Sequence, residues 1–203
     1  MRSLSEIDTT SKRASKAVGF SWGVAEEIGK SVRLLELFGL PGIKTLNQYY
    51  TLKNKNNFEN LNIIKENNFS EMNPYCPIVL GVSFLDQIRN IEKFKNITFN
   101  KIGFPLLVLP FLSKSSEIIG KKIKIRFDSI IFLLNLNVNI SSNLLDKSLP
   151  ETCENVEVNI IDNNDNFSDQ DWENLYKLSE KTFVEESDSL KQSAAGAGLT
   201  DND

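Results

Sequence analysis

Histidine is absent from this sequence of 203 residues, and its absence excludes several kinds of catalytic site. No Ser–His or Cys–His nucleophile pair can form, and no histidine can act as a general base. The commonest zinc ligand is missing too, and two cysteines alone cannot build a Cys-rich metal site. Catalysis would have to use Asp, Glu, Lys, Tyr, Arg or one Cys, and nothing in the residue spacing calls for a metal or a cofactor.

Long apolar runs are also lacking. The longest, Phe104 to Leu112, is interrupted by Pro105 and Pro110, whereas a membrane-spanning helix needs about 20 apolar residues. No apolar segment of the kind found in export signals follows the first residues. Cys76 and Cys153 are far apart in the sequence and are expected to be free thiols. These features together predict a cytoplasmic protein that has no membrane contact.

An excess of positive charge is missing as well. The net charge is −4, which argues against nucleic acid as a partner. The local cluster of Lys12, Arg13 and Lys16 is interpreted as a solvated helix face. Hydrophobic residues make up 40% of the chain and charged residues 25%, which is ordinary for a globular protein. We expect residues 1–203 to form a single domain.

The first part of the chain shows helical patterns. Ser3 and Glu6 have the spacing of a capping box, and Gly19 is placed to end that helix. A second helix is expected over residues 21–38, with one apolar stripe. A third, shorter helix is expected over residues 43–52. Residues 53–73, rich in Asn and Lys, indicate a short helix or loop, or a variable insertion.

The middle of the chain predicts strands. The apolar runs 77–84 and 105–112 are typical of buried strands, although periodicity alone does not exclude a helix. Apolar and polar residues alternate over 122–127, 134–140 and 156–160, as they do in antiparallel strands with one wet face.

The end of the chain predicts a helix that begins after Ser168, followed by a tail of small and polar residues over 187–203. The expected fold class is therefore α+β, with N-terminal helices, a mostly antiparallel sheet, a C-terminal helix and a small-residue tail.

The segment from Ser21 to Lys30 contains the best candidate for chemistry. Gly23 lies within the predicted helix, and so does Gly29, where each costs about 1 kcal/mol relative to Ala. Close approach of another element or of a ligand would compensate for that cost, and tight helix packing is the simpler alternative. The candidate catalytic acid/base residues are Glu26, Glu27 and Lys30. The candidate ligand-binding residues are Trp22 and Gly23. The alternative is an ordinary solvated helix face.

The tail is the second candidate. Gly196 and Gly198 allow the backbone amides to hold an anion, and Asp201 and Asp203 add negative charge. The alternative is a frayed chain end. Cys76, which lies between two prolines, is interpreted as a buried thiol rather than a nucleophile, because no base is evident nearby.

Taken together, these motifs resemble those of a bacterial family known only as a domain of unknown function. The resemblance rests on residues 21–30, on Pro105 and Pro110 with their apolar neighbours, on residues 172–184, and on the closing residues 196–203. It spans nearly the whole chain and implies no activity. It does imply that the tail is a family feature, which would dock into a groove, and that residues 53–73 are peculiar to this member. Glu185 in place of a proline, and Leu190 or Lys191 in place of an arginine, depart from the expected pattern.

Two hypotheses follow. The first is a protein that binds or transforms a small polar metabolite, without histidine or metal, between the second helix and the tail. The second is a homo-oligomer or accessory interaction protein whose tail docks into a partner.

Overall fold

The computed structural model describes residues 2–53, 57–144 and 149–183. They fall into two compact units, divided between Asn163 and Asn164, each of which is described by itself. Within the first unit, three helices open the chain, and two more helices and six strands follow. Their bounds are α1 Leu4–Ala17, α2 Trp22–Leu37, α3 Gly42–Lys53, β1 Asn67–Asn68, α4 Pro77–Ile91, β2 Asn96–Gly103, α5 Leu109–Ile119, β3 Lys122–Phe127, β4 Ile130–Asn135, β5 Asn139–Ser142 and β6 Thr152–Ile161.

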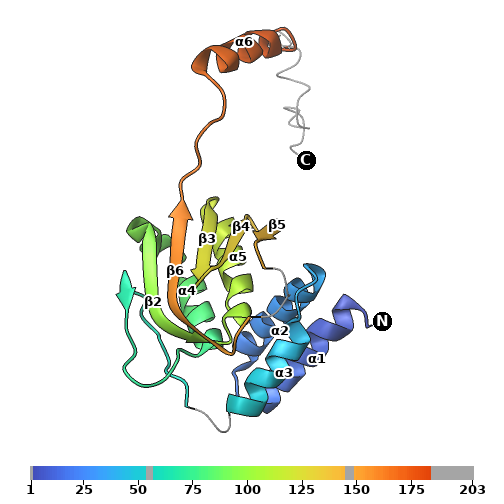
Figure 1. Cartoon of the computed structure of the whole chain (residues 1–203). Helices are drawn as coiled ribbons and strands as arrows, with labels where there is room; N and C mark the ends of the chain where they lie inside the picture. Colours follow the sequence, from blue (N-terminus) through green and yellow to red (C-terminus); the bar gives the residue numbers. More distant parts are fainter. Residues whose placement is uncertain (1, 54–56, 145–148, 184–203) are drawn as a thin grey trace, which may run out of the picture. The chain divides into compact units, whose positions relative to one another are not determined.

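The sheet has the strand order β1-β2-β6-β3-β4-β5. Only the pair β1–β2 is parallel, and the other four pairs are antiparallel. Helices α4 and α5 cover one face of the sheet, as Figure 1 shows. The α+β prediction is confirmed.

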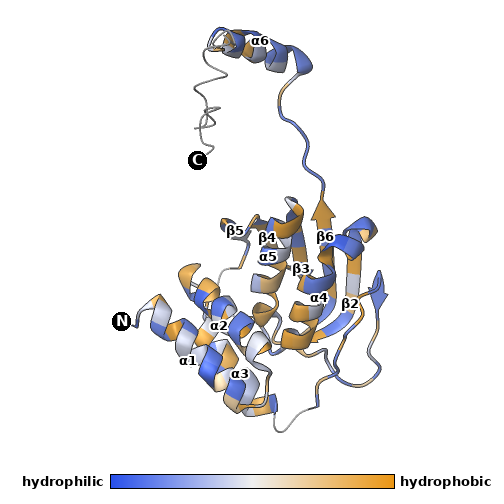
Figure 2. Ribbon diagram, turned by 180° about the vertical axis from the view of Figure 1, so that it is seen from behind, coloured by the Kyte–Doolittle hydropathy of each residue, from blue (hydrophilic) through white to orange (hydrophobic). Residues whose placement is uncertain are grey.

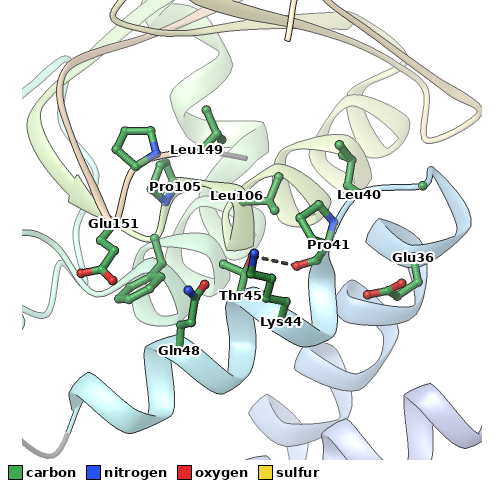
Figure 3. Close-up of a pocket in the computed structure, with 13 residues that line it drawn as sticks. Glu36, Leu40, Pro41, Lys44, Thr45, Gln48, Pro105, Leu106, Leu149 and Glu151 are labelled. Atoms are coloured by element: carbon green, nitrogen blue, oxygen red, sulfur yellow. Dashed lines mark hydrogen bonds between the residues drawn. The ribbon is translucent and has the colours of Figure 1, made fainter. Parts of the chain in front are cut away.

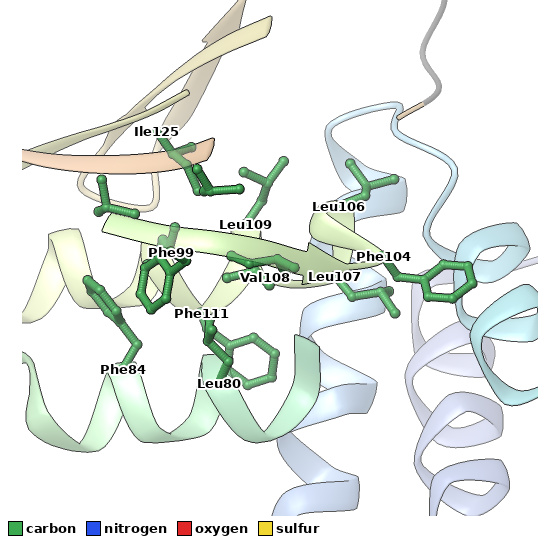
Figure 4. Close-up of a cluster of buried hydrophobic side chains, with 14 of the residues drawn as sticks. Leu80, Phe84, Phe99, Phe104, Leu106, Leu107, Val108, Leu109, Phe111 and Ile125 are labelled. Carbon is green, nitrogen blue, oxygen red and sulfur yellow. The ribbon is translucent and has the colours of Figure 1, made fainter. Parts of the chain in front are cut away.

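On β3 and β6, buried apolar residues alternate with more exposed polar residues, as predicted. Ile123, Ile125 and Phe127 are buried, whereas Lys122 and Arg126 are exposed. The sheet therefore has one apolar face, against which α4 and α5 pack (Figure 2). Figure 4 shows the core between these layers. Its buried aromatic members include Phe84, Phe99 and Phe111.

The prediction of strands in the two proline-led runs is wrong. Residues 77–84 begin α4, and residues 105–112 form a short 3-10 helix, Pro105–Leu107, that leads into α5. Each proline lies in the first turn of its helix, where its missing N–H removes no intrahelical hydrogen bond. Residues 105–112 are buried throughout, and in 77–84 only Val79 and Val82 are half-buried, so neither run has a solvated face that would reveal the helical periodicity.

The predicted strand over residues 134–140 is also interrupted. Leu136 and Asn137 have φ values of 51° and 58°, so they form a tight turn between β4 and β5. The alternating pattern continues through the turn, and alternation alone could not reveal it. Strand β2 was not predicted. Of the stretch that was expected to be a short helix, a loop or a variable insertion, residues 57–73 are described, and they contain β1, which pairs with β2.

The helix α6, Asp169–Glu180, lies in the second unit and begins at Ser168, as predicted. The Ser168 hydroxyl accepts a hydrogen bond from the Asp171 amide at 3.1 Å, and the Asp171 carboxylate accepts one from the Ser168 amide at 3.0 Å. This is a capping box. Along α6 an apolar row includes Trp172, Leu175 and Tyr176, which are exposed. None of the helices in the described part of the chain is long and apolar enough to cross a membrane.

Candidate functional site

The charged residues predicted on α2 do come together. The Lys30 ammonium lies 2.9 Å from a Glu26 carboxylate oxygen and 3.3 Å from one of Glu27. Glu27 also forms an ion pair with Lys114, which reaches it from α5. The cluster therefore links α2 to the sheet-covering layer, a connection that the sequence did not reveal because residues 105–112 were expected to be a strand.

These ion pairs determine the charge states. Burial by itself would raise the pKa of Glu27, but the hydrogen bonds and charges of Lys114 and Lys30 outweigh it, so the pKa lies below its ordinary value. The hydrogen bond from Lys30 also lowers the pKa of Glu26. The pKa of Lys30 is raised, chiefly by its hydrogen bond with Glu26 and also by its hydrogen bond with Glu27. All three groups therefore stay ionised at neutral pH.

A hollow of about 270 Å³ adjoins this cluster. It is called the α2 hollow here, and α1, α2, α5 and the β4–β5 turn contribute its walls. The lining residues are Asp8, Lys30, Ser31, Arg33, Leu34, Leu37, Lys114 and Asn137. Three of these are cations and one is an anion. Arg33 and Asp8 lie 3.8 Å apart, which is too far for a hydrogen bond but close enough for an ion pair.

Two polar atoms in the walls of the α2 hollow lack partners. Ser31 is 4% exposed, and its hydroxyl makes no hydrogen bond within the described residues. The side-chain oxygen of Asn137 is likewise inaccessible and unpaired there. A buried polar atom without a partner costs about 1–3 kcal/mol, and Ser11 and Ser113 carry two more such hydroxyls in the described part of the chain.

The two glycines of α2 differ. A side chain at Gly29 would meet the Asp8 carboxylate oxygen at 2.6 Å and the Asp8 backbone oxygen at 2.7 Å, so the missing Cβ lets α1 and α2 approach closely. At Gly23 nothing lies within 4 Å. The helix-packing alternative therefore explains Gly29, and nothing in the structure explains Gly23. Trp22 and Gly23 lie in the first turn of α2, outside the α2 hollow.

The predicted tail residues Gly196, Gly198, Asp201 and Asp203 lie outside the described residues, as do Glu185, Leu190 and Lys191. Both cysteines are free, as predicted. The predicted burial of Cys76 is confirmed, but Cys153, which was expected in a polar loop, is buried in β6. Cys76 lies 3.1 Å from the Tyr49 hydroxyl.

A larger pocket of about 460 Å³ lies beside α3, and the sequence did not indicate it. It is called the α3 pocket here and is shown in Figure 3. Its polar lining residues are Glu36, Lys44, Thr45, Gln48 and Glu151, and its apolar ones are Leu40, Pro41, Phe104, Pro105, Leu106, Leu149 and Pro150. The α3 members recur every three or four residues, which places them on one helix face.

Comparison with known families adds one match. The model of a protein of unknown function (DUF3726) matches residues 2–75. The expected resemblance to a domain of unknown function is thus confirmed over α1 to α3 and the segment that follows, about a third of the chain, and it carries no activity. No curated protein and no solved structure matches the chain. Among the described residues, no group of three or more Cys, Asp or Glu side chains is arranged to hold a metal ion.

Proposed function

We propose that this protein binds a small, polar, anionic metabolite in the α2 hollow. The observation that carries the proposal is the α2 hollow itself, which presents the cations Lys30, Arg33 and Lys114. The cations are complementary to a carboxylate or phosphate.

The charge states support binding more than proton transfer. A carboxyl group that acts as a general acid at neutral pH needs a raised pKa, and a lysine that acts as a general base needs a lowered pKa. Glu26, Glu27 and Lys30 are displaced in the opposite directions. The ion pair of Glu27 with Lys114 instead holds the Lys114 side chain beside the hollow, and Lys30 bridges Glu26 and Glu27. The predicted catalytic roles of these three residues therefore become positioning roles in the proposal.

A cytoplasmic location is part of the proposal, since the two cysteines are free. A role of the tail in ligand binding also stays a prediction. A chain that ends at Ser189 tests this contribution, because it removes all four predicted tail residues.

The experiment is a thermal-shift screen with lactate, malate, citrate, glutamate and glycerol phosphate as probes. A ligand present at about 100 times its dissociation constant stabilises the folded state by about 2.7 kcal/mol. Lys114→Met should cut this stabilisation to about half or less, as an affinity at least about tenfold weaker requires, whereas the control Lys122→Met removes the same charge from the exposed first residue of β3 and should leave it intact. Equal shifts for wild type and Lys114→Met would exclude the α2 hollow as the site.

A second function, that of an interaction protein, is favoured by the C-terminal unit. Residues 164–203 contain ten Asp and Glu against three Lys and Arg, while residues 1–163 contain 17 against 20. Within α6, the apolar row that includes Trp172, Leu175 and Tyr176 is exposed. An amphipathic helix of this kind is a common docking element, and the opposite charges of the two segments favour a second copy of the chain as its partner.

Light scattering tests this second function with a matched pair of variants. Leu175→Asp places a charge in the apolar row, and Asn174→Asp places the same charge next to it in sequence but on another side of the helix. A dimer that only Leu175→Asp dissociates would support self-association. A monomeric wild type at all concentrations would exclude it.

A further inference from the structure

The α3 pocket is separate from the α2 hollow, although α2 contributes to both. Three polar side chains at the α3 pocket, Lys44, Gln48 and Glu151, make no hydrogen bond or ion pair with any residue in the described ranges. In the view of Figure 3, they lie along one side, and the apolar Leu149 and Leu106 lie along the other. The pocket thus offers an ammonium, a carboxylate and an amide, together with an apolar wall.

The other polar groups of the α3 pocket are already engaged. The Glu36 carboxylate accepts a hydrogen bond from the Ile43 amide at 2.8 Å, which satisfies a free N–H at the start of α3. The Thr45 hydroxyl donates to the Pro41 carbonyl oxygen at 2.7 Å. Glu36 and Thr45 therefore fix the wall of the pocket, and the free charges are those of Lys44 and Glu151.

The apolar wall has a strained backbone. Phe104 has φ 45° and ψ 56°, a left-handed conformation that a bulky residue rarely adopts. Its amide donates to the Glu151 carbonyl oxygen at 2.7 Å, and its ring packs 5.6 Å from that of Tyr49 and 6.3 Å from that of Phe58. Strain of this kind gathers at ligand sites. The hydrogen bond between Phe104 and Glu151 connects the apolar wall directly to the residue that carries the free carboxylate.

We propose that the α3 pocket binds an amino acid with an apolar side chain. Its carboxylate would face Lys44, its ammonium Glu151, and its side chain the wall of Phe104, Pro105 and Leu106. A volume of about 460 Å³ is within the range of small-molecule sites. The single lysine and two glutamates that line the pocket argue against a phosphorylated ligand. This inference goes beyond the proposed function, which concerns a different site and a different ligand.

The test uses methyl NMR of the full chain with labelled leucine residues. Leu40, Leu106 and Leu149 report on the α3 pocket, whereas Leu34 and Leu37 report on the α2 hollow. Free leucine and phenylalanine are the probes. We expect shifts at the three α3-pocket leucines only, and binding of glycine about tenfold weaker, because glycine buries no apolar side chain.

Two variants and two modified probes separate the charges. Lys44→Met should weaken leucine binding about tenfold and leave the binding of leucinamide, which lacks the carboxylate, nearly unchanged. Glu151→Gln should weaken leucine binding to a similar degree and leave that of N-acetylleucine, which lacks the ammonium, nearly unchanged. Lys122→Met is the control for net charge and should change neither.

Three results would overturn the proposal. The first is the absence of any shift at Leu40, Leu106 and Leu149 with about 20 mM leucine, a concentration that detects even millimolar affinity. The second is a set of shifts confined to Leu34 and Leu37, which would place the amino acid in the α2 hollow. The third is an equal loss of affinity for leucine and leucinamide on Lys44→Met, which would show that the lysine does not recognise the carboxylate.

Discussion

The two glycines of α2 make a matched pair, and replacing each with alanine should change stability in opposite directions. At Gly23 the new methyl group meets nothing within 4 Å, so the substitution only reduces the freedom of the unfolded chain. Gly→Ala substitutions that fit without strain stabilise by about 0.4–1 kcal/mol. Because Gly23 lies in the first turn of the helix, we expect a gain of about 0.5 kcal/mol, near the lower end.

At Gly29 the same gain is outweighed by steric overlap. The methyl group would lie 2.7 Å from the Asp8 backbone oxygen, and a backbone atom cannot rotate away as a side chain can. Helix α1 must therefore move, and overpacking of this kind costs about 1–3 kcal/mol. We expect a net loss of about 1–2 kcal/mol, which corresponds to a fall in melting temperature of about 2–4 °C per kcal/mol.

Urea unfolding of the full chain measures both changes. The midpoint should rise for Gly23→Ala and fall for Gly29→Ala, with the slope m unchanged in both. Because Asp8 also lines the α2 hollow, Gly29→Ala should in addition lower the affinity for a ligand that binds there. Equal stabilisation by both substitutions would refute the account of α1–α2 packing.

Three further predictions concern other parts of the first unit. Gly81→Ala should lose about 1–3 kcal/mol in urea unfolding, because its methyl group would meet the Phe111 ring atom Cγ at 2.7 Å, and Phe111→Leu in the same chain should recover part of the loss. Burial raises the pKa of Cys153 to about 12, so in a Cys76→Ser variant a thiol reagent at pH 8 should label Cys153 only after unfolding; rapid labelling of the native protein would contradict this. The pKa of Glu27 is lowered from its ordinary 4.5, so its stabilisation is complete above that pH and is lost as the pH falls through the lower, folded-state pKa; the stability difference between wild type and Glu27→Gln should shrink in acid unfolding curves, and a difference that grows there would be inconsistent with the ion pair.

Much of this fold could be predicted from patterns that involve only a few neighbouring residues, because such patterns do not depend on tertiary packing. The capping residues Ser3 and Ser168 and the alternation over 122–127 each depend on neighbours in sequence, and the structure confirms them. The proline-led run 77–84 was misassigned because a short, nearly continuous apolar run does not distinguish a strand from a helix. The turn at Leu136 was missed because a leucine rarely adopts a left-handed conformation.

The candidate site could be predicted only in part, for a related reason. Glu26, Glu27 and Lys30 lie on one helix, so their spacing alone places them together. Lys114 and Asn137 reach the α2 hollow from α5 and from the β4–β5 turn, and both of these elements were misassigned from the sequence. Residues that meet through tertiary packing leave no periodic trace, and the same holds for the whole α3 pocket.

The central claim is that the α2 hollow binds a small anion through the Lys114 ammonium. Its most direct test is a calorimetric titration of the best probe from the thermal-shift screen into the wild-type protein and into Lys114→Met. The account predicts saturable binding to the wild type that weakens at least about tenfold in the variant, as the loss of a charge-assisted contact requires. Unchanged affinity in Lys114→Met would contradict it.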